Sequence, residues 1–128
     1  MFFSVIIALY NRPQEIDELL HTLTQQTYTQ FEVLVIEDGS KLDAREIVAA
    51  YQDKLDIRYY FKENEGQGFT RNYGSKLAKG DYFVIFDSDC LIPANYLETV
   101  RNYLFEHKLD AYGGPDAAHG SFTPVQKA

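Results

Sequence analysis

Apolar and polar positions alternate along this chain in blocks that predict strands and helices in turn. Short, nearly continuous apolar runs rich in Val, Ile and aromatic residues are typical of buried strands. Four such runs cover residues 2–9, 31–36, 57–61 and 82–86. Apolar residues at helical spacing predict helices from Pro13 onward and over residues 44–51, 69–78 and 94–105. The last residues, 121–128, have no clear pattern, and we expect no regular element there.

Strands that alternate with helices predict an α/β fold, with a mostly parallel sheet covered by helices on both faces. The length of 128 residues suits a single domain. In such sheets ligands bind beyond the carboxyl ends of the strands. Polar clusters follow three of the predicted strands, at residues 10–12, 37–40 and 87–89. We therefore expect one ligand site at this edge of the sheet.

The cluster Asp87-Ser88-Asp89 follows a strongly apolar strand and presents two carboxylates with one spacer. Carboxylate oxygens suit hard divalent cations such as Mg²⁺ or Mn²⁺, which keep coordination positions open for substrate phosphates. Short Asp-x-Asp strings also occur by chance, and a turn or a helix cap is the alternative. Cys90 is a soft ligand beside a hard site, so we expect it to be a packed residue.

The other strand-end clusters each allow two interpretations. Asp38 either forms a turn with Gly39 or accepts N–H donors from a ligand. Tyr10 is either an edge aromatic or a surface on which a flat ligand stacks. Arg71, one turn into a predicted helix, pairs with phosphate, with Asp38, or in an exposed salt bridge. Gly66 begins a Gly-x-Gly that lacks the third glycine of a dinucleotide fingerprint and follows the third strand, which excludes a nicotinamide site.

Composition narrows the possible partners. The formal net charge is −7, which argues against nucleic-acid binding because that function requires a basic face. The single cysteine excludes an internal disulfide and fits a reducing compartment. The apolar start of the chain is short and has no basic segment before it, so we expect neither a signal peptide nor a membrane span there.

Four ordered motifs resemble those of the family 2 glycosyltransferases, which are inverting enzymes with the GT-A fold. The matching segments are residues 5–11, 35–40, 64–74 and 86–89, and the resemblance extends from the first strand to about Pro115. It implies a nucleotide-diphospho-sugar donor, usually UDP-linked, and a Mn²⁺ or Mg²⁺ ion. It also implies a sugar, a lipid-linked sugar or a polysaccharide as the acceptor.

The resemblance assigns roles to individual residues. Ala8 and Tyr10 would lie along the nucleotide base, and Asp38 would hydrogen-bond it. Arg71 would lie near the base or the phosphates. Asp87 would lie near the ribose and the metal, and Asp89 would coordinate the metal. The donor-binding set is completed by Asn64, Gly68 and Ser88.

An inverting transferase also needs a general base for the acceptor hydroxyl. In the resembling enzymes a Glu-Asp pair usually supplies it, and no such pair follows Asp89 here. The remaining polar candidates are Asp116 and His119, and we take Asp116 as the candidate base, with a Gly-Pro turn as the alternative role of that segment. We therefore expect an amino-terminal portion of a longer enzyme, with a nucleotide-binding core over 1–92 and a helix and the start of the acceptor side over 93–128. This portion would bind the donor with little transfer activity. We expect a cytoplasmic location, at the inner face of the membrane for the longer enzyme, and self-association through exposed apolar surface.

Three other functions share parts of this pattern. A nucleotidyltransferase also combines an α/β domain with carboxylate-held Mg²⁺, but it would need a glycine-rich loop after the first strand, and residues 9–14 contain no glycine. A non-catalytic nucleotide-binding module would lack the base but keep the donor site. A phospho-acceptor receiver domain would need acidic residues after the first strand, where this chain has Tyr10 and Asn11.

Overall fold

The computed structural model describes residues 1–107, 111–115 and 122–127, with side chains as far as residue 106. Its elements follow in the predicted order. They are β1 (Phe3–Leu9), α1 (Pro13–Thr24), β2 (Phe31–Asp38), α2 (Arg45–Ala49), β3 (Ile57–Lys62), α3 (Gln67–Leu77), β4 (Tyr82–Phe86), α4 (Tyr96–His107), β5 (Ala111–Pro115) and β6 (Phe122–Lys127). None of the described helices is long and apolar enough to cross a membrane.

The strands form one sheet in the order β3-β2-β1-β4-β6-β5. The four strands β1 to β4 are parallel, whereas β6 runs antiparallel to β4 and β5 antiparallel to β6. The predicted mostly parallel α/β fold is confirmed. The expectation that residues 121–128 form no element is wrong, because Phe122–Lys127 is a strand. The backbone of this strand pairs with the edge of β4 that would otherwise be open. Because this pairing depends on tertiary structure, a strand of this length is hard to identify from its own sequence.

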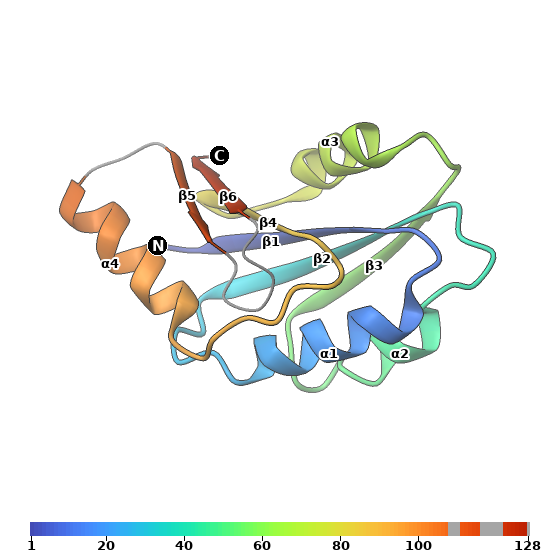
Figure 1. The fold of residues 1–128 in the computed structure, drawn as a ribbon, viewed down its shortest axis with the longest axis horizontal. Coiled ribbons are helices and arrows are strands. Elements are labelled where there is room, and N and C mark those ends of the chain that lie inside the picture. Colours follow the sequence, from blue (N-terminus) through green and yellow to red (C-terminus); the bar gives the residue numbers. More distant parts are fainter. Residues whose placement is uncertain (108–110, 116–121, 128) are drawn as a thin grey trace.

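The helices cover both faces of the sheet (Figure 1). The larger core lies on the side of α1, α2 and α4, where the strand residues Val5, Ile7 and Leu9 point. The smaller core lies under α3 and contains Ile6 from the opposite face of the same strand. Every residue of β1 and β2 is buried, as expected for central parallel strands. The prediction that Cys90 is a packed residue is confirmed, because Cys90 is 2% exposed and belongs to the larger core.

Helix α3 lies close to the sheet because it has a glycine at the contact. A Cβ at Gly74 would lie 2.7 Å from Cγ2 of Ile6 and 3.3 Å from Cγ1 of Ile36. No side chain larger than hydrogen fits without displacing these buried residues. This contact fixes the height of α3 above β1 and β2, and so places the first turn of α3 beside the carboxyl ends of those strands.

A partly buried ion pair stabilises the opposite, amino-terminal end of the sheet. Glu32 accepts hydrogen bonds from the Ser4 hydroxyl at 2.6 Å, from Nη2 of Arg58 at 2.7 Å and from the Lys79 amide at 2.7 Å. Burial raises the pKa of Glu32, but these hydrogen bonds and the Arg58 charge outweigh it, so the net pKa is lowered. The network ties the α3–β4 connection to the sheet.

Candidate functional site

The structure brings most of the predicted site residues together at the carboxyl ends of the parallel strands, in two adjoining hollows. The first, which we call the inner hollow, has a volume of about 300 Å³ and is lined by Ala8, Tyr10, Arg12, Asp38, Asn64, Gly66, Gln67 and Ser88. The second, the acidic hollow, has a volume of about 460 Å³ and is lined by Arg12, Glu15, Gln67, Asp87, Ser88 and Asp89. Three residues belong to both: Arg12, Gln67 and Ser88.

Asp38 forms the floor of the inner hollow and is 4% exposed. One carboxylate oxygen accepts the Glu65 amide at 2.8 Å and the other accepts the Gly66 amide at 3.0 Å. The ammonium group of Lys62 lies 3.5 Å away. Burial raises the pKa of Asp38, but the two amides, the Thr70 hydroxyl and the Lys62 charge together lower it. Asp38 is therefore ionised at neutral pH, and it lines the inner hollow.

Tyr10 forms a wall of the same hollow. It follows the last residue of β1, and its side chain is 50% exposed, so one ring face is open to a ligand. The backbone turns sharply at the next residue, Asn11, which has a φ of +52°. This left-handed turn carries the chain from the strand into α1. Ala8, two residues before Tyr10, is 7% exposed and presents only a methyl group to the hollow.

Arg71 reaches the acidic side of the site from α3. Its Nη2 lies 2.9 Å from Oδ1 of Asp87, which forms an ion pair. Asp87 is therefore the partner, and the alternative pairing with Asp38 is wrong. The Nε–H of Arg71 is buried and has no acceptor among the described residues. A buried donor without an acceptor is unusual in a folded protein.

The donor set at the end of β4 fits a hard divalent cation that a ligand helps to hold. Asp87 and Asp89 both face the acidic hollow and offer carboxylate oxygens. In the part of the chain that the structure describes, no three His, Cys, Asp or Glu side chains form a group that could hold a metal ion. Two carboxylates leave several coordination positions for phosphate oxygens and water, which is how Mg²⁺ is usually bound.

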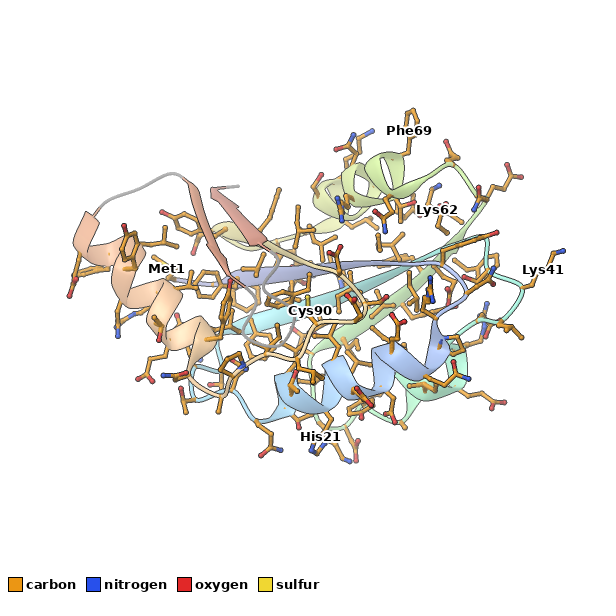
Figure 2. All side chains as sticks on the ribbon, in the orientation of Figure 1. Met1, His21, Lys41, Lys62, Phe69 and Cys90 are labelled. Atoms are coloured by element: carbon orange, nitrogen blue, oxygen red, sulfur yellow. The ribbon has the colours of Figure 1, made fainter. Side chains whose placement is uncertain are left out.

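Two predicted residues are not part of this arrangement. Gly68 lies inside α3 and lines neither hollow, so its prediction as a residue of the same site is not supported by the geometry. It lines a separate shallow pocket with Glu65, Phe69 and Asn72. Phe69 lies on the outer side of α3 and points away from the sheet (Figure 2). Asp116, the predicted base, lies outside the described residues.

The structure also adds residues to which the sequence interpretation gave no role in the site. Arg12, Glu15 and Gln67 line the hollows together with the backbone of Gly66. Arg12 and Glu15 stand at the start of the helix that follows β1, and Gln67 begins the helix that follows β3. Helix starts after parallel strands lie at the ligand edge of the sheet, and this position was the signal that could have identified them.

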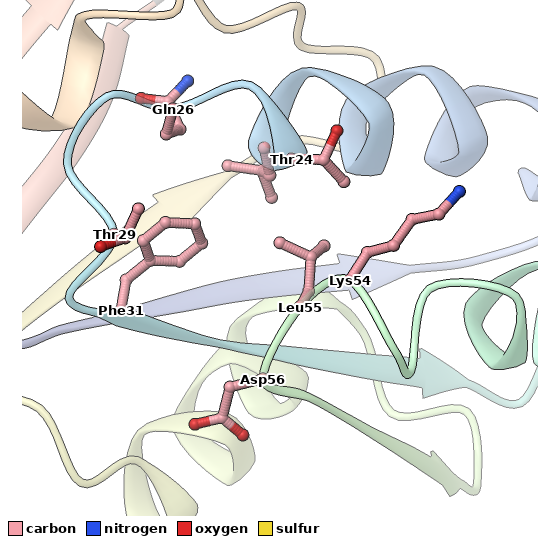
Figure 3. Close-up of a pocket in the computed structure, with 8 residues that line it drawn as sticks. Thr24, Gln26, Thr29, Phe31, Lys54, Leu55 and Asp56 are labelled. Atoms are coloured by element: carbon pink, nitrogen blue, oxygen red, sulfur yellow. The ribbon is translucent and has the colours of Figure 1, made fainter.

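A smaller hollow of about 140 Å³ lies at the opposite edge of the sheet (Figure 3). Its lining includes Phe31 at the start of β2, Asp56 just before β3 and Thr24 at the end of α1. It contains one carboxylate and no exposed aromatic face for stacking. This hollow therefore offers neither the cation-binding pair nor the stacking surface found at the carboxyl ends.

Comparisons with known proteins agree with this geometry. The family described as glycosyl transferase family 2 matches residues 4–127. An uncharacterized glycosyltransferase of Rickettsia felis is 37% identical over 110 residues, which cover 81% of this chain and 18% of the relative. Validoxylamine A glucosyltransferase of Streptomyces hygroscopicus subsp. jinggangensis is 36% identical over 119 residues, which cover 90% of this chain and 26% of the relative.

The solved structures give the same result. The crystal structure of S. aureus TarS 1-349 has a TM-score of 0.85 and 28% identity, covering 99% of this chain and 47% of that chain. Its complex with UDP-GlcNAc has a TM-score of 0.82 and 36% identity, covering 87% of this chain and 33% of that chain. The chain spans only 16–32% of the length of several curated relatives. Because the family match covers nearly all of its residues, the chain belongs to glycosyltransferase family 2 and has the GT-A fold.

Proposed function

We propose that this chain binds a nucleotide-diphospho-sugar, with UDP as its nucleotide, and that the whole protein transfers the sugar to an acceptor. The observation that carries the proposal is the junction of the two hollows. One hollow has an open aromatic face and a buried carboxylate, the other has two carboxylates, and they share Arg12, Gln67 and Ser88. TarS, which is similar to this chain, has been crystallised with UDP and with UDP-GlcNAc.

In this proposal the uracil and ribose occupy the inner hollow. The base stacks on Tyr10, whose ring is half exposed. An N–H of the base donates to the Asp38 carboxylate, which its backbone partners hold in place and keep ionised. Ala8 leaves room beside the ring, and Asn64 is oriented by donating its amide to the Asp38 carbonyl at 3.0 Å.

The diphosphate then lies at the junction, where Arg12 supplies a positive charge and Ser88 a hydroxyl. Arg71 approaches the same region from α3 through its ion pair with Asp87. Asp87 and Asp89 are the residues that would hold Mn²⁺ or Mg²⁺, and the cation would supply positive charge to the leaving diphosphate. The ion pair with Arg71 orients the Asp87 carboxylate toward that position.

Transfer with inversion requires a base on the acceptor side to take the proton of the acceptor hydroxyl. We retain Asp116 as the proposed base of this chain. The acceptor in the proposal is a sugar, a lipid-linked sugar or a polysaccharide. The family match favours sugar transfer over the nucleotidyltransferase alternative.

Calorimetry of UDP binding in the presence and absence of Mn²⁺ tests the donor site. We expect Asp89→Asn to weaken Mn²⁺-dependent UDP binding by at least about tenfold, because it removes one of two carboxylate ligands. Asp53→Asn is the matched control, since Asp53 is exposed and lines neither hollow. If the unsubstituted chain binds no UDP under either condition, or if both variants bind equally well, the proposal is wrong.

A further inference from the structure

Glu15 is the one carboxylate of the acidic hollow to which no role has been given. It lies in the first turn of α1, and its side chain is 36% exposed. Its Oε2 accepts a hydrogen bond from the Ser88 hydroxyl at 3.1 Å. Its Oε1 lies 3.6 Å from Nη1 of Arg12. Glu15 therefore contacts two of the three residues that the hollows share.

The geometry argues against a direct role in holding the cation. Among the described residues, Glu15, Asp87 and Asp89 do not form a group that could hold a metal ion, although all three line the same hollow. The hydrogen bond instead links Glu15 on α1 to Ser88, which is 73 residues away in sequence and lies in the turn between the two aspartates. Glu15 can therefore act on the donor through Ser88 and Arg12, or directly through its negative charge.

We propose that Glu15 is a positioning residue for the donor diphosphate. It fixes the Ser88 hydroxyl and, with it, the Asp87-Ser88-Asp89 turn against the start of α1. The loop after β1, which carries Tyr10, and the turn after β4 are thereby held in one relative position. This inference rests on the proposed function, because it concerns the same donor site.

The two contacts of Glu15 are unequal. Arg12 has a side chain that is 64% exposed, so solvent screens its ion pair and the pair contributes little. The hydrogen bond from Ser88 is part-buried and is made to a charged acceptor, which makes it the stronger of the two. The Ser88 contact should therefore carry most of the effect on binding.

The direction in which UDP affinity changes distinguishes a positioning role of Glu15 from an effect of its negative charge alone. The carboxylate of Glu15 is negative and lies beside the place proposed for a diphosphate. If it acted only through its charge, its removal would strengthen UDP binding, because like charges repel. If it positions Ser88, its removal weakens binding, and glutamine restores binding because its carbonyl oxygen still accepts the hydroxyl proton.

The experiment compares Glu15→Ala, Glu15→Gln, Ser88→Ala and the Glu15→Ala/Ser88→Ala double variant. UDP affinity at saturating Mn²⁺ is measured by calorimetry, and Mn²⁺ uptake in the presence of UDP by the electron paramagnetic resonance of free Mn²⁺. Thermal unfolding is recorded for each variant to verify folding. Glu18→Gln is the matched control, because Glu18 lies on the same helix and is exposed.

We expect Glu15→Ala to weaken UDP binding and Mn²⁺ uptake by about fivefold, as for one lost hydrogen bond to a charged group with part exposure. Glu15→Gln and Glu18→Gln should remain within about twofold of the parent. The double variant should bind about as weakly as Ser88→Ala alone, because both substitutions remove the same contact.

The proposal is overturned if the parent binds UDP and Glu15→Ala binds it equally well or more tightly. Additive losses in the double variant, or a Glu15→Gln variant as weak as Glu15→Ala, also overturn it. A parent that binds no UDP overturns the donor-site proposal itself and this one with it, so the two failures are distinguishable.

Discussion

The hydroxyl oxygen of Ser40 accepts a hydrogen bond at 2.7 Å from the backbone N–H of Asn11. The side-chain oxygen of Asn11 in turn accepts the amides of Lys41 at 2.8 Å and Leu42 at 3.1 Å. The Ser40 hydroxyl also donates to the buried carboxylate of Glu37. These contacts join the loop after β1 to the loop after β2. One hydrogen-bond network therefore holds both loops beside the inner hollow.

Asn11 should be sensitive to the loss of either its left-handed backbone or its acceptor oxygen. Asparagine is one of the few residues that adopt a φ such as +52° readily, whereas alanine in this conformation costs about 1–2 kcal/mol, and Asn11→Ala also removes the acceptor. Asn11→Gly removes only the acceptor, and Asn11→Asp keeps both properties. We expect stability to fall in the order Asp, Gly, Ala, measured by urea unfolding. Equal unfolding free energies for Ala and Asp would show that the turn does not depend on this residue.

Gly39 should not tolerate alanine. Its φ is +68°, and an added Cβ would lie 2.7 Å from the backbone nitrogen of Asn64 and 2.9 Å from the Asn64 Cβ. We expect Gly39→Ala to destabilise the fold by about 1–3 kcal/mol and to displace Asn64 from the inner hollow. The measurements are thermal unfolding and UDP calorimetry.

Gly68→Ala is the control for this glycine. Among the described residues, no atom outside the neighbouring residues and the backbone of α3 lies within 4 Å of the added Cβ. Because Gly68 is inside α3, alanine should stabilise the protein by up to about 1 kcal/mol. If Gly39→Ala is as stable as Gly68→Ala, the contact with Asn64 does not limit the position.

Acid should destabilise the fold through Glu32. Its pKa in the folded state is lowered from the usual 4.5, so the unfolded chain binds the proton at a higher pH. The stabilisation is fully present above the unfolded pKa and is lost as the pH falls through the folded pKa. Glu32→Gln should therefore be less stable at pH 7 and should lose less further stability on acidification. Urea unfolding from pH 7 to pH 3 measures both effects.

Glu46→Gln serves as the reference for this pH series, because Glu46 is exposed and its charge is screened by solvent. It should follow the pH dependence of the parent. An acid slope that Glu32→Gln leaves unchanged would mean that other carboxylates, such as Asp38, carry the pH dependence.

The sequence predicted the order of β1 to β4 and their helices because periodicity reports burial, and burial dominates in a doubly covered parallel sheet. The ends of elements were less well predicted. Strand β2 extends through Asp38, two residues further than expected, because Glu37 and Asp38 pair with Phe61 and Lys62 of β3. Helix α3 begins at Gln67, two residues early, because Gly66 with a φ of +98° makes the turn before it.

Because ligands bind beyond the carboxyl ends of parallel strands, the sequence predicted that Tyr10, Asp38 and the Asp87-Ser88-Asp89 cluster share one edge of the sheet. The structure places them there. Glu15 was missed because a charged residue in the first turn of a helix is indistinguishable in sequence from any solvated helix residue. Contacts across 73 residues, such as the one from Glu15 to Ser88, depend on strand order, which periodicity does not specify. The predicted roles of these residues in donor binding stay predictions.

Strand order makes the two sides of the proposed donor site unequal in stiffness. Asp87 follows β4, which pairs with β1 along its whole length and with β6 over residues 82–84. The segment with Asn64 and Gly66 follows β3, which borders the described sheet and has β2 as its one neighbour there. In hydrogen exchange, strands at the edge of a sheet open before central strands. Local opening should therefore release the nucleoside first, while the two aspartates stay in place. In the proposed site, a nucleotide would then dissociate with its base leaving first.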